Sequence, residues 1–131
     1  MDHTIVHFEI PADNPERATQ FYRELFGWDI QKFESEGGPE YWLISTVPRD
    51  AKGHPARPGV NGGLMRRQHP EHPPVNYVGV ESVDGYVQKA KRLGAKEYMP
   101  KTPVKGMGWF AYLTDTEGNV FAIWESDEKA V

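Results

Sequence analysis

Two ionisable side chains near the start of the chain have types and a spacing suited to acid–base chemistry. His7 and Glu9 are two residues apart in the segment Val6–Ile10, whose other positions are apolar. Successive strand side chains point to opposite faces, so this alternation predicts a strand with His7 and Glu9 together on its polar face. Either group could act as a general base that removes a proton next to a carbonyl, if burial tunes its pKa toward neutrality.

The elements that must position these side chains occur twice in the chain. Val6–Glu34 and Asn76–Pro100 each predict a strand, a turn, a helix, a glycine and a second strand, in that order. A segment typical of a β-hairpin follows each copy. The sequence therefore predicts an α+β fold of two βαβββ units, with the helices covering the apolar strand faces and the other faces lining a concave surface.

Both helices have recognisable ends. In the first copy Asp13 or Asn14 can cap a helix that has Pro15 in its first turn, and Gly27 suits its left-handed C-terminal position. In the second copy Asp84 is the expected cap, and the helix ends at Gly94. The apolar residues of each helix recur on one face and should be buried; they are Ala18, Phe21, Tyr22, Leu25 and Phe26 in the first, and Tyr86, Val87, Ala90 and Leu93 in the second.

Length and composition limit the classes of function. The 131 residues predict one body, with a first unit at about 3–67, a linker at 68–74 and a second unit at about 75–126. The net charge of −4 argues against nucleic acid or an anionic membrane as partner, and no apolar run suits a membrane span. Without cysteine the chain has no disulfide and no thiolate site. We expect a cytoplasmic protein without a signal peptide.

Three segments outside the repeat are interpreted as loops. Residues 48–58 form a polar insertion, and residues 68–74 a stiff, proline-rich linker. We expect His54, His69 and His72, which lie in these two segments, to be solvated. Residues 101–108, with two glycines, suggest either an ordinary loop or a mobile flap.

Several of these segments together resemble the vicinal-oxygen-chelate superfamily, which includes glyoxalase I, extradiol dioxygenases and bleomycin-resistance proteins. The resemblance lies in motifs from both units and covers nearly the whole chain; the motifs are HFEI at 7–10, DNPERA at 13–18, FYRELFGW at 21–28, YVGV at 77–80 and DTEGNVF at 115–121. It implies that the paired units form a cup-shaped mixed sheet. In the metalloenzymes of this family the cup holds a divalent cation that acts as a Lewis acid on substrate oxygens.

The ligands that the resemblance implies are mostly missing. His7 stands at the family's first-strand histidine, but the second unit has Asn76 or Tyr77 where another histidine is expected. The last strands carry Gly62-Gly63 and Ala122 where carboxylates are expected, and Glu125 has the wrong parity. One retained ligand of four falls short of the three that a catalytic site usually needs. We therefore do not expect metal-dependent glyoxalase I activity, and predict no cofactor beyond a weakly held divalent metal at His7.

The resemblance leaves three classes of function open. The first is a glyoxalase-like lyase or isomerase that uses His7 or Glu9 on an unidentified small molecule. The second is a binding protein of the bleomycin-resistance type, and the third a structural or regulatory domain. Aromatic cup walls with a few polar groups suit a small ligand, including a cation; the candidate substrate-binding residues are Trp42, Tyr77, Glu81, Trp109, Phe110, Tyr112 and Trp124. Family members usually form homodimers, and we expect one here.

Overall fold

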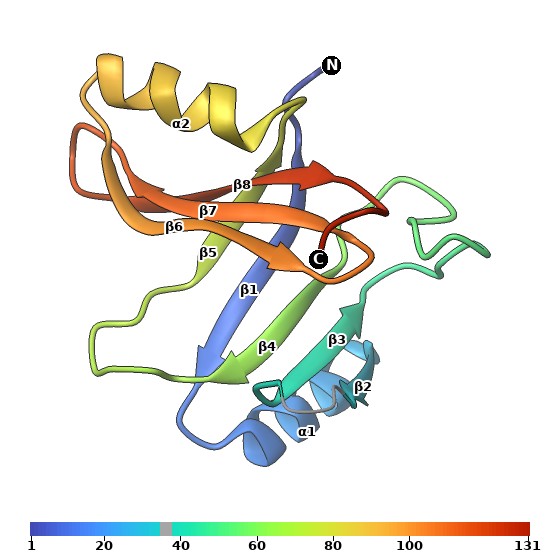
Figure 1. Ribbon diagram of the computed structural model, residues 1–131. Helices are drawn as coiled ribbons and strands as arrows, with labels where there is room; N and C mark the ends of the chain where they lie inside the picture. The colour runs from blue at the N-terminus through green and yellow to red at the C-terminus, as the bar shows by residue number, and fades with distance from the viewer. Residues whose placement is uncertain (35–37) are drawn as a thin grey trace. The chain divides into compact units, whose positions relative to one another are not determined.

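The computed structural model describes residues 1–34 and 38–131 and divides the chain into two compact units. The N-terminal unit comprises residues 7–74, and the C-terminal unit combines residues 75–131 with residues 1–6. Each unit holds one helix and four strands, as the repeat predicts (Figure 1). The expected α+β fold of two βαβββ units is confirmed. No helix in the described residues is long and apolar enough to cross a membrane.

The strands of the N-terminal unit are ordered β2-β3-β4-β1. β1 and β4 are parallel neighbours, whereas β2, β3 and β4 pair antiparallel. The elements are β1 Ile5–Ala12, α1 Pro15–Phe26, β2 Asp29–Phe33, β3 Tyr41–Ser45 and β4 Gly62–Arg66. One sheet face packs on α1 in a core that contains Ala12, Ile30, Trp42, Ile44 and Leu64. The other face of these strands carries no helix of this unit.

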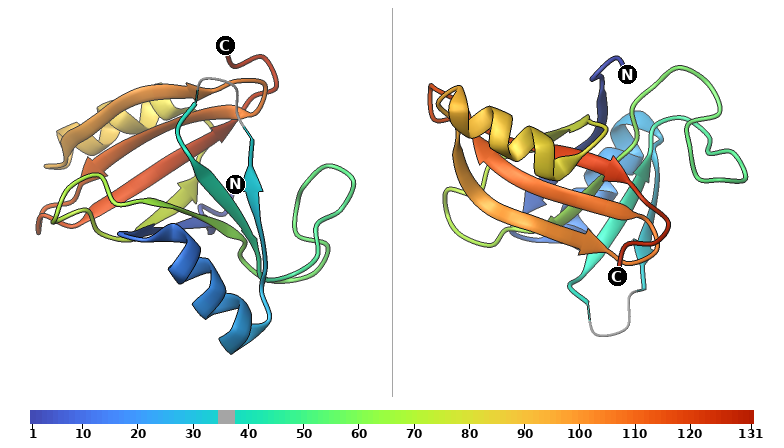
Figure 2. Two further views of the ribbon diagram at one scale, coloured as in Figure 1. Left: turned by 90° about the horizontal axis from the view of Figure 1, so that it is seen from below. Right: turned by 45° about the horizontal axis from the view of Figure 1, so that its top comes forward.

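The C-terminal unit repeats this arrangement with the order β5-β8-β7-β6. β5 is parallel to β8, and β6, β7 and β8 pair antiparallel. The elements are β5 Val75–Gly79, α2 Val83–Arg92, β6 Lys96–Val104, β7 Gly108–Thr114 and β8 Val120–Ser126. Further views show that each helix covers one face of its own unit's strands (Figure 2). Under α2 the buried core contains Val80, Val83, Val87, Ala111, Leu113 and Ile123.

The helix ends follow the local signals, with one correction. Asn14 caps α1 by accepting a hydrogen bond from the Arg17 N–H, and Gly27 is left-handed with a φ of 71°. The cap of α2 is Ser82 and not Asp84, because the Ser82 side chain accepts from the Gly85 N–H. Glu125 Oε1 also accepts from the Val83 N–H at 2.9 Å, so a carboxylate supports the start of α2.

Three further expectations are corrected by the structure. Residues 101–108, interpreted from the sequence as an ordinary loop or a flap, begin as strand, because β6 continues to Val104 and pairs with β7. His72, expected to be solvated, is only 7% exposed and accepts the Gln68 N–H through Nδ1. The apolar side of α1 is only partly buried. Three of its large side chains, Phe21, Leu25 and Phe26, are each more than half exposed.

Candidate functional site

The face of the N-terminal unit that carries no helix brings the two sequence-predicted catalytic residues together. Phe8 and Ile10 of β1 pack with the α1 core, so strand alternation turns His7 and Glu9 to the opposite face. We call this the polar face and define it by His7, Glu9 and Tyr41. Glu9 is only 5% exposed, and His7 is partly buried.

Tyr41 joins these two side chains through its hydroxyl group. The Tyr41 O–H donates to Glu9 Oε2 at 2.9 Å, and His7 Nε2 lies 2.8 Å from the same hydroxyl. A phenol has one proton, so Tyr41 accepts from His7 while it donates to Glu9. This arrangement places the proton of the neutral His7 ring on Nε2. The result is a continuous hydrogen-bonded line from an imidazole through a phenol to a carboxylate.

The electrostatics of His7 favour a neutral ring. Burial, and to a smaller extent the nearby positive charge of Arg49, lower the pKa of His7 from 6.5 to about 4. At neutral pH the imidazole is therefore uncharged, with a lone pair on Nδ1. A neutral ring can donate to Tyr41 and still accept a proton elsewhere.

Gly63 makes the Tyr41 position feasible. Gly63 stands opposite Glu9 on one side and Leu43 on the other, and the ring of Tyr41 crosses over it toward Glu9. A Cβ atom at Gly63 would overlap the Tyr41 hydroxyl. Tyr41 was not among the residues predicted from the sequence. A glycine inside a strand signals a close approach of another group, and Gly62-Gly63 was the available clue.

His72 lies close enough to the polar face to sense its charge. Burial lowers the pKa of His72, and the negative charge of Glu9 opposes that shift. The His72 ring also stacks on His69, with ring centroids 5.6 Å apart. The charge of Glu9 thus acts on the linker histidine, which local sequence could not show because the effect depends on how residues 68–74 fold back.

The corresponding face of the C-terminal unit is aromatic. It carries four of the candidate substrate-binding residues, Tyr77, Phe110, Tyr112 and Trp124, which pack around Ala122. The hydroxyl groups of Tyr77 and Tyr112 are 2.6 Å apart, and the Tyr98 ring lies tilted beside that of Tyr112, with centroids 6.5 Å apart. We call this the aromatic face and define it by the four candidates.

The other three candidate substrate-binding residues lie elsewhere. Trp42 is 4% exposed in the core under α1, on the side of the sheet away from Glu9. Trp109 packs against the α2 core, with its indole N–H bonded to Asp127 and Lys101 over its ring. Glu81 is half exposed and pairs with His3 and the N-terminal amino group. Strand alternation explains why both tryptophans point into the helix-covered cores. Trp42 is next to Tyr41 and Trp109 is next to Phe110, and both of those neighbours lie on the faces without a helix.

The helix caps show which sequence positions of the two units are equivalent. They therefore identify the residues that stand at the family's ligand positions. Seven residues before the caps Asn14 and Ser82 stand His7 and Val75, so His7 corresponds to Val75 and not to Asn76 or Tyr77. The strand registers then match Gly63 with Ala122. Valine, glycine and alanine offer no side-chain ligand, so these residues do not fit the family's metal site.

Among residues 1–34 and 38–131, no group of three or more His, Cys, Asp or Glu side chains lies together in an arrangement that could hold a metal ion.

Comparisons with known proteins place this geometry in a family. The family model for the Glyoxalase/Bleomycin resistance protein/Dioxygenase superfamily matches residues 4–123. "Putative glyoxylase CFP32" of Mycobacterium bovis, and the protein of that name in Mycobacterium tuberculosis, are 25% identical over 123 residues, which is 91% of this chain. The chain spans only 44% of the length of those relatives.

Solved structures agree on the fold. Hypothetical protein BH1468 from Bacillus halodurans has a TM-score of 0.69 at 14% identity, covering 100% of this chain and 99% of that one. Methylmalonyl-CoA epimerase from Streptomyces coelicolor, in complex with 2-nitronate-propionyl-CoA, scores 0.66 at 16% identity and covers 93% and 96%. The epimerase from Mycobacterium tuberculosis scores 0.67 at 12% identity and covers 94% and 87%.

Proposed function

This chain belongs to the Glyoxalase/Bleomycin resistance protein/Dioxygenase superfamily, and from that premise we propose that it moves a proton next to the carbonyl group of a small molecule, using its own side chains. The observation that carries the proposal is the hydrogen-bonded line of His7, Tyr41 and Glu9. The reaction would be a glyoxalase-like isomerisation or epimerisation, to which the names of the relatives and structural neighbours also point.

In this proposal Glu9 is the general base. Its carboxylate takes a proton from the carbon next to the carbonyl, and the electron pair of that C–H bond moves onto the carbonyl oxygen as an enolate. Once Glu9 carries the proton, the Tyr41 O–H can turn from Glu9 toward the developing oxyanion. Return of the proton to the opposite face of the same carbon, after the enolate has turned over in the site, completes an epimerisation. When the reacting carbon carries a hydroxyl group, as in a hemithioacetal, return of the proton to the neighbouring carbon and transfer of the hydroxyl proton to the oxyanion complete an isomerisation.

The neutral state of His7 supports this division of roles. A ring with a pKa of about 4 holds Tyr41 through its Nε2–H and does not compete for the proton at neutral pH. Tyr41 is thus held between a donor and an acceptor, which fixes the phenol before substrate arrives. Such preorganised donors lower the energy of a developing oxyanion more than mobile water does.

Hydrogen–deuterium exchange tests the proposal without requiring the natural substrate. The protein is incubated in D₂O with methylmalonyl-CoA or with the hemithioacetal of methylglyoxal and 2-mercaptoethanol, and loss of the α-proton signal is followed by NMR. We expect catalysed exchange with one of these probes, and its loss in E9Q. Exchange no faster than in buffer for both probes, or an E9Q variant as active as the wild type, would refute the role of Glu9.

The aromatic face supports a second candidate, a binding protein for flat or cationic molecules. Tyr77, Phe110, Tyr112 and Trp124 share that face, and aromatic rings attract such ligands by stacking and cation–π contact. Quenching of tryptophan fluorescence by a panel of aromatic cations, lost in W124F and kept in W109F, would favour this reading. Unchanged fluorescence across the panel would count against it.

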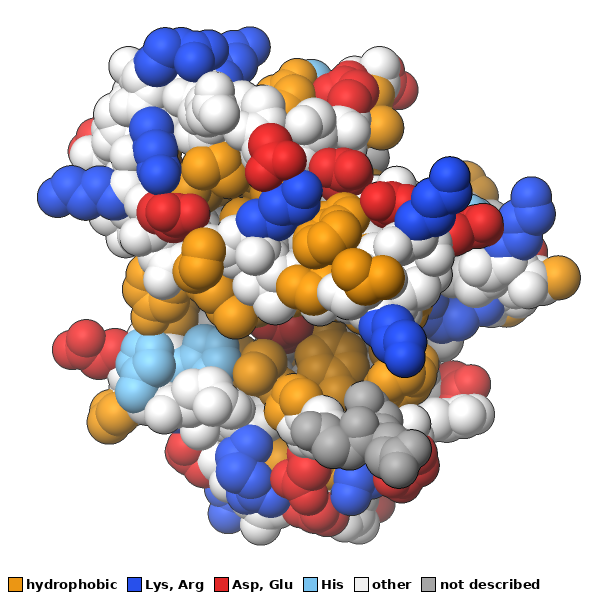
Figure 3. Space-filling model, in the orientation of Figure 1, with side chains coloured by type: hydrophobic (Ala, Val, Ile, Leu, Met, Phe, Trp, Pro, Cys, Tyr) orange, Lys and Arg blue, Asp and Glu red, His pale blue; other side chains and the backbone are white. Residues whose placement is uncertain are grey.

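We further propose that the protein acts in the cytoplasm as a homodimer. The lack of cysteine supports the location, and the membership in a family whose members usually form homodimers supports the dimer. On the surface in Figure 3, basic and acidic side chains are interspersed, an arrangement that does not favour nucleic acid as a partner. Light scattering of the purified protein and fractionation of the source cells test the two statements.

A further inference from the structure

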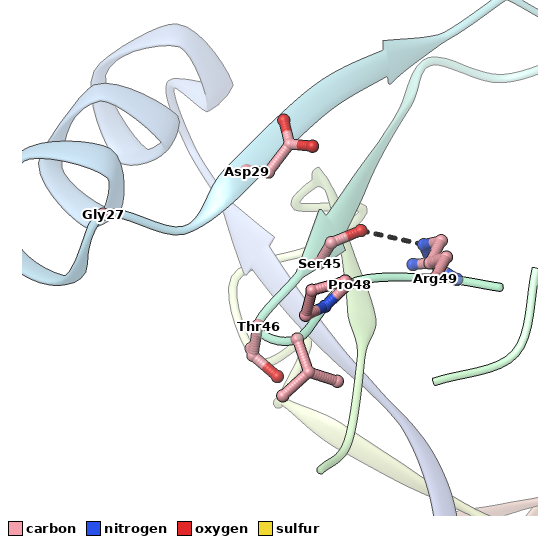
Figure 4. Close-up of a pocket in the computed structure, with 7 residues that line it drawn as sticks. Gly27, Asp29, Ser45, Thr46, Pro48 and Arg49 are labelled. Carbon is pink, nitrogen blue, oxygen red and sulfur yellow. Dashed lines mark hydrogen bonds between the residues drawn. The ribbon is translucent and has the colours of Figure 1, made fainter. Parts of the chain in front are cut away.

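A pocket of about 380 Å³ lies at one end of the N-terminal unit, where β3 leads into the following loop. Its lining combines polar side chains with a fixed arginine, and comprises Gly27, Asp29, Ser45, Thr46, Val47, Pro48 and Arg49. In Figure 4 the Ser45 hydroxyl points to the guanidinium of Arg49. This pocket plays no part in the proton transfer proposed above.

Three hydrogen bonds hold the Arg49 guanidinium in one orientation. Nε donates to Ser45 Oγ at 2.8 Å, one terminal nitrogen donates to the Gly53 carbonyl at 3.1 Å, and the other to the Ile44 carbonyl at 3.2 Å. A guanidinium has five N–H groups, so two have no partner among the described residues. Within residues 1–34 and 38–131, Arg49 also forms no ion pair.

The loop that carries Arg49 is itself well structured. Asp50 Oδ1 accepts the N–H groups of Lys52 and His54, and the Asp50 N–H donates to the His54 carbonyl. Those backbone N–H groups lower the pKa of Asp50, so its carboxylate stays ionised and engaged within the loop. The expected polar insertion is therefore a folded turn that presents Arg49 from a defined position.

Ser45, which accepts a hydrogen bond from Arg49, lies on the same row across the sheet as His7. Ser45 stands opposite Asp29. Gly62 pairs with Phe8 on one side and with Ile44 on the other. One residue further along these strands, Asn61 therefore stands between His7 and Ser45. Strands are about 4.8 Å apart, so Ser45 lies about 10 Å across the sheet from His7. Arg49, bonded to Ser45, thus places its charge within the length of a small molecule that reaches His7.

Asn61 provides a second unsatisfied donor on this row. Its side chain is 4% exposed, and its Oδ1 accepts the backbone N–H groups of Thr46 and Val47, which line the pocket. These two bonds fix which atom is oxygen, and they leave Nδ2 as a buried nitrogen without a hydrogen-bond partner in the described residues. Buried donors are nearly always paired, so this end of the sheet has an excess of N–H groups over acceptors.

We propose that Arg49 anchors a carboxylate of the substrate whose reacting carbon lies at Glu9. The substrate class is therefore a small carbonyl compound with a chain long enough to carry an anionic end across the roughly 10 Å of sheet between the His7 and Ser45 positions. A guanidinium held in a fixed plane suits a carboxylate because two parallel N–H groups can meet its two oxygens. The carboxylate of Asp29 lines the same pocket and repels anions. It repels a doubly charged phosphate more strongly than a singly charged carboxylate, so a carboxylate fits the pocket better.

This inference rests on the proposed function, and matched substrates separate the two. The probes are hemithioacetals of methylglyoxal with 6-mercaptohexanol, 6-mercaptohexanoate and (6-mercaptohexyl)trimethylammonium, which share the reacting carbon and a chain long enough to cross the row, and end in a neutral, an anionic and a cationic group. Exchange of the α-proton in D₂O is followed for each. We expect kcat/KM to be about tenfold higher for the anionic probe than for the neutral one, the usual effect of a charge-assisted hydrogen bond, and lowest for the cationic probe.

Variants assign that preference to Arg49. R49Q should remove the preference for the anionic probe, whereas R57Q, the same change of charge in the same loop, should keep it. R49K loses the loop hydrogen bonds but keeps the charge, so a partial preference in R49K shows that R49Q acts through charge and not through loop damage. D29N should strengthen the preference, because it removes the opposing carboxylate.

Equal rates for the neutral and anionic probes in the wild type, or a preference that survives R49Q, would overturn the anchoring role while leaving proton transfer intact. If none of the probes exchanges, titration with propionate decides the anchor separately. A saturable shift of the Arg49 Nε–Hε signal in NMR, which R57Q retains, supports the site, and an unchanged signal refutes it.

Discussion

The faces of the two units that carry no helix of their own unit use equivalent positions for different purposes. Alignment through the caps and strand registers matches Glu9 with Tyr77, Gly63 with Ala122, and Tyr41 with Phe110. The first set forms a hydrogen-bonded line around a buried carboxylate, and the second packs aromatic rings around a buried methyl group.

The difference between Gly63 and Ala122 explains how one scaffold supports both faces. The missing side chain at Gly63 lets the Tyr41 ring cross the strand and reach Glu9. Ala122 is fully buried, and Tyr77 and Tyr112 meet across its strand, with their rings edge to face and their hydroxyl groups 2.6 Å apart. A tyrosine hydroxyl thus reaches a carboxylate above Gly63, whereas beside Ala122 two tyrosine hydroxyl groups bond to each other.

The largest expected effect is on the rate of α-proton exchange, which should depend on Glu9 and not on its counterpart Tyr77. E9Q should reduce α-proton exchange by about 10²- to 10⁴-fold, the usual contribution of a general base, because the amide cannot take the proton. Y77F should change the rate less than about threefold, a change too small to reflect a lost catalytic group. NMR exchange rates with the two probes provide the measurement, and circular dichroism verifies folding. A Y77F loss as large as that of E9Q would place the chemistry on both faces.

The next effect is the pH dependence that His7 gives to the free energy of unfolding. The C-terminal unit has no counterpart of this contribution, because Val75 stands at the equivalent position and cannot titrate. The pKa of His7 is about 4 when folded and near 6.5 when unfolded, so the unfolded chain binds more protons between these values. Stability attributable to His7 is complete above about pH 6.5 and declines as the pH falls toward 4, by up to about 3 kcal/mol. Urea unfolding of the wild type and H7Q at several pH values measures the difference. Equal slopes in the two proteins would contradict a buried neutral His7.

Reciprocal substitutions at the glycine and alanine test the account of the two faces. G63A should destabilise the protein by about 1–3 kcal/mol and slow exchange, because the new methyl group displaces the Tyr41 hydroxyl. A122G should cost about 1 kcal/mol through lost burial and leave exchange unchanged. Thermal unfolding and the D₂O assay are run on both variants. A G63A protein that exchanges at the wild-type rate would show that Tyr41 is dispensable.

The smallest effect concerns the tyrosine pair of the aromatic face. The hydroxyl groups of Tyr77 and Tyr112 are 2.6 Å apart, so Y77F and Y112F should each cost about 1 kcal/mol, and the double variant less than their sum. Urea unfolding of the four proteins gives the coupling energy. Strict additivity would mean that the bond contributes nothing to stability.

The sequence predicted the scaffold well because the scaffold depends on local signals. Asn14, Pro15 and Gly27 mark the ends of α1, and alternation alone turned His7 and Glu9 to one face. Tyr41 was missed because its role depends on the register of three strands and on the empty space above Gly63. Likewise the sequence did not determine whether Trp42 and Trp109 face the cores under the helices, where the structure places them, because a shift of one residue in strand parity reverses the face.

The composition of the C-terminal unit from the two ends of the chain has a consequence for the order of folding during synthesis. Residues 7–74 are contiguous and can complete their unit while the ribosome is still producing the rest. Residues 1–6, by contrast, are made before residues 7–74 but must wait for residues 75–131 before Thr4 can accept the Gly79 N–H and His3 can meet Glu81. This segment is therefore made before the contiguous unit and reaches its place after it.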